Sequence, residues 1–101
     1  SEFVQVGHTA KGAVLSYNSR HPFHTELLKI KETIEKNNPD ETYKAAKKLN
    51  SLIDLLLISY CKSELAFDNE DEMTPEELVE DLRINWGRFL ERYLKKINEN
   101  G

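Results

Sequence analysis

Apolar positions recur at helical spacing in three stretches of the chain, and a proline stands near the start of each stretch. In the first stretch, Leu27, Ile30 and Ile34 follow Pro22 at intervals of three and four residues. This spacing gathers the apolar side chains on one face of a helix, and proline is well tolerated in the first turn. The pattern therefore predicts a helix over residues 22–37.

The second and third stretches carry stronger start signals. Asn38 precedes Pro39, and Thr74 precedes Pro75, so each proline follows a side chain that can accept a hydrogen bond from the first turn. These signals predict helices over residues 39–65 and 75–98. Apolar residues occupy nearly the whole circumference of the second helix, so we expect it at the centre of the fold.

The first twenty residues have a different pattern. Two β-prone runs flank a loop that is bounded by Gly7 and Gly12, which is typical of a hairpin. An isolated two-stranded hairpin is marginal in water, so a flexible arm is the alternative. Residues 1–3 contribute little to these predictions. A chain of 101 residues supports one domain, so we expect a mainly α fold with an arm over 1–20 and a helical domain over 21–101.

Charge is distributed unevenly along the chain, whose formal net charge is -4. Residues 63–82 contain nine acidic and no basic residues, while every other part is neutral or basic. This block is either a solvated connection and helix start, or an acidic patch that docks on a basic partner. The sequence pI of about 5.4 disfavours a nucleic-acid partner.

The single cysteine, Cys61, excludes an intramolecular disulfide. It comes late in an apolar helix, so we expect it to be buried as a small hydrophobic side chain. The longest apolar stretch, over residues 52–58, is too short to span a bilayer and contains Asp54. Without a secretory signal pattern at the first residues, we expect a cytoplasmic protein, or one of the host cytoplasm if a phage encodes it.

Two histidines, His21 and His24, are spaced as metal ligands can be on a helix. No clear third ligand accompanies them, and His21 before Pro22 is better interpreted as a helix N-cap or loop residue. No residue pattern indicates a catalytic site, a metal or a cofactor. We therefore expect a protein that is not an enzyme.

The most unusual local feature is a glycine beside a tryptophan within the third helix. A helical glycine costs about 1 kcal/mol relative to alanine, which a close approach of another backbone can offset. The aromatic residues around it are either core anchors or the centre of a contact between subunits. The candidate partner-binding residues are Trp86, Gly87, Phe89, Leu90 and Tyr93 on this helix, and Glu70, Asp71 and Glu72 in the acidic block.

Three segments carry a resemblance to a known family. They are the apolar segment Leu52–Tyr60, the segment Met73–Leu82 with its Thr-Pro-Glu-Glu start, and the closing segment Phe89–Leu94. Together they cover about half the chain, and their order resembles the tail assembly chaperones of long-tailed bacteriophages. The resemblance implies a small, acidic, largely helical protein that binds apolar helices of a tape measure protein and self-associates.

We therefore expect a non-enzymatic helical protein-interaction module, most specifically a phage tail assembly chaperone, with a protein partner and a homo-oligomeric state. The alternative is a small acidic regulatory or inhibitory protein. That protein would use the acidic block over residues 64–81 to occupy a basic, nucleic-acid-binding surface of its partner. The two hypotheses differ in the surface they use, which is apolar in the first and acidic in the second.

Overall fold

Two strands and three helices make up the fold. The computed structural model describes residues 2–67 and 72–100. The elements are β1 (Val4–Thr9), β2 (Gly12–Tyr17), α1 (Pro22–Glu35), α2 (Pro39–Leu65) and α3 (Pro75–Asn100). The predicted fold class, three helices preceded by a short hairpin, is confirmed, and each helix boundary lies within two residues of the prediction.

Side chains fix where each helix begins. The Asn38 side chain accepts hydrogen bonds from the backbone N–H groups of Asp40 and Glu41 at the start of α2. At the start of α3, the Thr74 hydroxyl accepts from the Glu77 N–H at 3.2 Å and donates to the Glu77 carboxylate at 3.0 Å. These bonds satisfy donors that a helix leaves free at its N-terminus.

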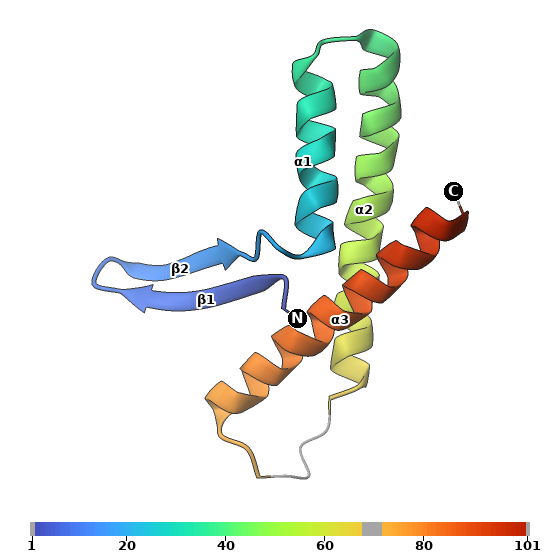
Figure 1. The fold of residues 1–101 in the computed structure, drawn as a ribbon. Coiled ribbons are helices and arrows are strands. Elements are labelled where there is room, and N and C mark those ends of the chain that lie inside the picture. The colour runs from blue at the N-terminus through green and yellow to red at the C-terminus, as the bar shows by residue number, and fades with distance from the viewer. Residues whose placement is uncertain (1, 68–71, 101) are drawn as a thin grey trace.

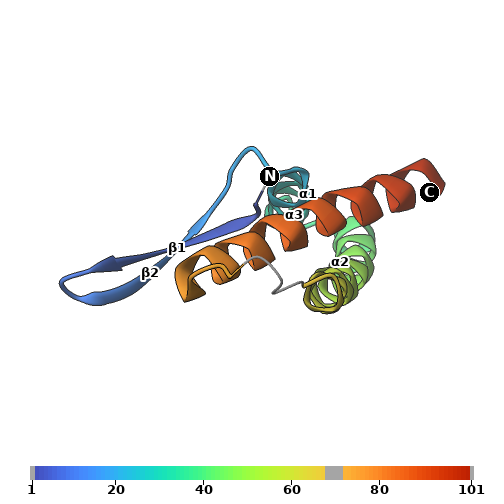
Figure 2. The same cartoon turned by 90° about the horizontal axis from the view of Figure 1, so that it is seen from below.

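The three helices form two packed layers (Figure 1). α1 and α2 run antiparallel as a helical hairpin, and α3 crosses α2 diagonally over its C-terminal half. Seen from below, the molecule is flat, with principal extents of 52 × 38 × 18 Å (Figure 2). The core lies where α3 meets the other two helices, and it consists of Phe3, Val4, Phe23, Ile30, Ala45, Leu52, Leu55, Leu90 and Leu94.

The β-hairpin projects sideways from the start of α1 (Figures 1 and 2). Its strands pair antiparallel, with Val4 opposite Tyr17 at the root and Thr9 opposite Gly12 near the tip. Only the root is buried, since every residue of both strands except Val4 is exposed. The sequence-based interpretation gave residues 1–3 little importance in the fold, which is wrong for Phe3. Phe3 is 3% exposed, and its ring centroid lies 5.0 Å from that of Phe23.

α2 contacts both α1 and α3, but it is not covered all round. Its buried residues Ala45, Leu52, Leu55, Ser59 and Ser63 share one face, and both neighbouring helices pack there. The opposite face is open to solvent. The expected burial of Cys61 is therefore wrong, because Cys61 lies on that open face and is exposed.

Within residues 2–67 and 72–100, no helix is both long and apolar enough to cross a membrane.

Candidate functional site

A buried joint connects the start of α1 to the middle of α3. The His21 side chain is fully buried, and its Nδ1 accepts a hydrogen bond from the Phe23 N–H at 3.1 Å. Because Nδ1 is an acceptor, the ring proton lies on Nε2, which donates to the Gly87 carbonyl at 2.8 Å. The predicted capping role of His21 is confirmed, and its second bond fixes the start of α1 to the middle of α3.

A second joint holds α3 against α2. The Trp86 Nε1–H donates to the Leu56 carbonyl at 3.0 Å and to the Ser59 hydroxyl at 3.1 Å. The Trp86 ring meets the Tyr60 ring edge-on, with centroids 5.4 Å apart. The ring contact and the two N–H hydrogen bonds together fix Trp86 in one orientation.

Two serines make this close packing possible, and sequence reasoning missed them. Ser59 and Ser63 are completely buried, and their hydroxyls donate to the carbonyls of Leu56 and Tyr60 on their own helix. They are thus small and internally satisfied, which lets α3 approach α2 closely. Their spacing of four residues within an apolar helix was the available signal.

The predicted partner-binding residues of α3 divide between interior and surface. Gly87 and Leu90 are buried within this chain, whereas Trp86, Phe89 and Tyr93 are half-buried. Phe89 and Tyr93 stack at 6.4 Å between ring centroids, and the Arg92 guanidinium lies 5.6 Å from the Phe89 ring centre. Of the acidic candidates, Glu72 is exposed, while Glu70 and Asp71 lie outside the described residues.

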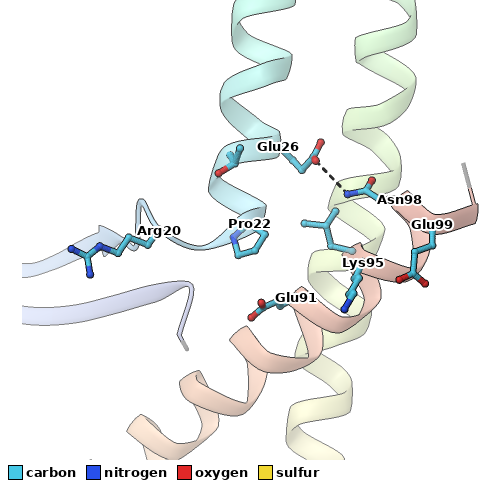
Figure 3. A pocket seen from close by; sticks show the side chains of 9 residues that line it. Arg20, Pro22, Glu26, Glu91, Lys95, Asn98 and Glu99 are labelled. Atoms are coloured by element: carbon cyan, nitrogen blue, oxygen red, sulfur yellow. Dashed lines mark hydrogen bonds between the residues drawn. The ribbon is translucent and has the colours of Figure 1, made fainter.

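A hollow of about 560 Å³ lies where the start of α1 meets the end of α3 (Figure 3). Acidic and basic side chains both line it, so neither sign of charge dominates. The buried Glu26 carboxylate at its edge accepts from the Asn98 amide at 3.4 Å and lies 3.6 Å from the ammonium groups of Lys29 and Lys48. These contacts join the three helices, so the Glu26 carboxylate is already engaged in the fold.

Several exposed large apolar side chains gather on the open side of α2. We call this surface, formed by Ile53, Leu57, Ile58, Cys61 and Leu65, the outer face of α2. Four of these side chains are strongly exposed: 46% for Ile53, 59% for Leu57, 58% for Ile58 and 84% for Leu65. They recur over about three turns of the open side of α2, where the exposed Asp54 lies among them.

The pKa of one side chain beside the outer face, Tyr60, is raised. The Glu64 carboxylate accepts a hydrogen bond from the Tyr60 hydroxyl and repels a negative charge there, which raises the pKa of Tyr60 above its ordinary value. In the described part of the chain, no group of three or more His, Cys, Asp or Glu side chains is arranged to hold a metal ion.

No family model, curated protein or solved structure matches the chain.

Proposed function

We propose that this chain is a non-enzymatic protein-interaction module that binds its partner through the outer face of α2. The observation that carries the proposal is the clustering of the exposed side chains Ile53, Leu57, Ile58 and Leu65 on one side of one helix. Single exposed apolar side chains are common on protein surfaces, but several clustered on one helix side usually mark a site of association.

The physical gain from covering this stripe is substantial. Complete burial of a leucine or isoleucine side chain contributes about 1.5–3 kcal/mol. Four such side chains, each roughly half-exposed or more, provide several kcal/mol toward a complex. A partner helix with an apolar stripe fits this surface, since helices recognise one another through side chains three and four residues apart.

The resemblance to phage tail assembly chaperones makes a more specific version of the same proposal. In that version, the partner is an apolar helix of a tape measure protein. The exposed apolar side chains of α2 support it, because they offer the kind of surface that such a helix requires.

The proposal is tested by site-specific photocrosslinking in the cells that naturally express the protein. A benzophenone amino acid replaces Leu57 on the outer face, and a control replaces Lys31, an exposed residue of α1. We expect discrete crosslinked products from position 57 that are absent from position 31. Ile58→Glu should reduce their yield, whereas Lys31→Glu should not. Identical products from both positions would refute the proposal.

A further inference from the structure

We infer that the open side of α2, which includes its outer face, pairs with the same side of a second copy of this chain, with the two α2 helices antiparallel. This inference rests on the proposed function and names the partner of that surface. The order of charged and apolar residues along one line of the helix favours this pairing.

A single line of positions runs along the middle of the open side of α2, at alternating spacings of three and four residues. Positions at this spacing share one side of a helix, so all of them can face one neighbouring helix, although four of the six residues here are polar. The seam consists of Lys47, Asn50, Asp54, Leu57, Cys61 and Glu64, all of which are exposed in the single chain.

The charges of the seam are complementary when two copies of it run in opposite directions. With a two-fold axis between Leu55 and Leu56, Lys47 of one chain lies level with Glu64 of the other. In the same register, Asn50 lies opposite Cys61, and Asp54 lies opposite Leu57. Each opposite-charge pair occurs twice because the interface is symmetric. The oppositely charged ends of the seam therefore stabilise the antiparallel arrangement.

A parallel pairing of the same seam is unfavourable. Each residue then faces its own copy, so Lys47 meets Lys47, Asp54 meets Asp54 and Glu64 meets Glu64. In that arrangement the two like charges of each of these three pairs repel each other, and no pair joins opposite charges. The charge pattern thus selects one direction of pairing.

The neighbouring side chains favour association but limit its strength. Ile53 and Ile58 flank the seam on its two sides and become covered when a second helix approaches. Asp54, by contrast, loses water opposite an apolar residue, which costs free energy. The seam extends only about 25 Å along the helix. We therefore expect a reversible dimer that forms in a concentration-dependent way.

Disulfide crosslinking tests the register, because the cysteine already present on the seam can serve as one partner. In Asn50→Cys, the new cysteine of one chain lies opposite Cys61 of the other. We expect mild oxidation to produce a covalent dimer, since a disulfide requires Cα atoms within about 7 Å.

Two matched proteins serve as controls. In the unmodified chain, the two Cys61 residues are about 16 Å apart along the seam, and the double variant Asn50→Cys/Cys61→Ala separates its two cysteines equally. Neither should crosslink. Efficient crosslinking of the unmodified chain through Cys61 indicates parallel pairing and overturns the inference, as does failure of Asn50→Cys to crosslink while its helical circular dichroism is unchanged.

A charge exchange provides an independent measurement by sedimentation equilibrium. Lys47→Glu and Glu64→Lys should each weaken the dimer about tenfold, because each converts two attractive pairs into two repulsive ones. The double variant Lys47→Glu/Glu64→Lys should restore the original dissociation constant. A double variant that is weaker than either single variant would overturn the inference.

The photocrosslinking experiment separates this inference from the proposed function. Products from position 57 that contain only other proteins, together with a strictly monomeric chain, overturn the dimer and leave the interaction module standing. An absence of any specific product overturns both.

Discussion

The imidazole of His21 and the backbone carbonyl of Gly87 are joined by a buried hydrogen bond of 2.8 Å across 66 residues of sequence. The same ring accepts a hydrogen bond from the first turn of α1 through its other nitrogen. One side chain therefore begins a helix and fixes that helix to another.

Replacing His21 should reveal both of its contacts. We expect His21→Ala to lower the free energy of unfolding by about 2–4 kcal/mol, because it removes a helix cap, a buried hydrogen bond and packing against Phe3. His21→Asn keeps a capping oxygen but is too short to reach Gly87, so we expect about half of that loss. Urea unfolding, followed by fluorescence of the single tryptophan, measures both.

His8 provides the control for this prediction, since it is exposed near the tip of the hairpin. His8→Ala should leave the unfolding midpoint unchanged. If His21→Asn is as unstable as His21→Ala, the capping bond contributes nothing and the account of the α1 start is wrong.

The contact between Trp86 and α2 should depend on the indole N–H. We expect Trp86→Phe to destabilise the protein by about 1–3 kcal/mol, because the Leu56 carbonyl and the Ser59 hydroxyl lose their shared donor and the ring becomes smaller. Ser59→Ala should cost less, since Leu56 still accepts the bond. Chemical unfolding followed by circular dichroism compares the two, and a larger loss from Ser59→Ala contradicts this ranking.

Phe3 should hold the hairpin to the helices. Its ring contacts Phe23 at 5.0 Å and Tyr17 at 5.5 Å between centroids. We expect Phe3→Ala to lower stability by about 3 kcal/mol, and Phe3→Leu to lower it less. Amide hydrogen exchange should show that β1 and β2 lose protection in Phe3→Ala while the centre of α2 keeps it. Equal protection of the strands in both proteins would show that the hairpin is held elsewhere.

The ionisation of Tyr60 should respond to Glu64. The Glu64 carboxylate raises the pKa of Tyr60 by accepting its hydrogen bond and by repelling the phenolate. Glu64→Gln removes the negative charge, so the pKa of Tyr60 should fall and the phenol should ionise at a lower pH than in the unmodified protein. An NMR titration of protein labelled at the tyrosine rings measures this change. Glu41→Gln, whose carboxylate lies by Lys44, should leave the Tyr60 titration unchanged.

Local signals in the sequence accounted for the elements of the fold. Asn38 and Thr74 start their helices as their positions next to proline predicted, because capping depends only on residues within one turn. The same reasoning identified His21 as a cap. It did not find the bond to Gly87, since no local rule indicates which distant carbonyl meets the other ring nitrogen.

The packing of the elements was harder to predict. A helix that is apolar nearly all round gives no information about which side its neighbours will cover, so Cys61 was wrongly expected to be buried. The buried pair Ser59 and Ser63 marks the side of α2 that its neighbours cover, because α3 needs small residues there for close approach. Phe3 was undervalued because its burial depends on the return of β2 and the start of α1, which residues 1–3 alone do not reveal.

The sequence drew attention to Trp86 and Gly87 for a sound reason, since both are unusual in their setting. The structure gives both residues internal partners. Exposed apolar side chains also gather on the open side of α2, and their role in binding stays a prediction.

The bond between His21 and Gly87 also has a consequence for synthesis. A ribosome adds about 5–20 residues per second, so His21 leaves it several seconds before Gly87. During that interval the α1 cap can form, but the His21 Nε2–H lacks its acceptor and the inner side of α2 lacks α3. Native packing therefore waits for the last helix, and nascent chains that stop before residue 87 expose the apolar side chains that α3 normally covers.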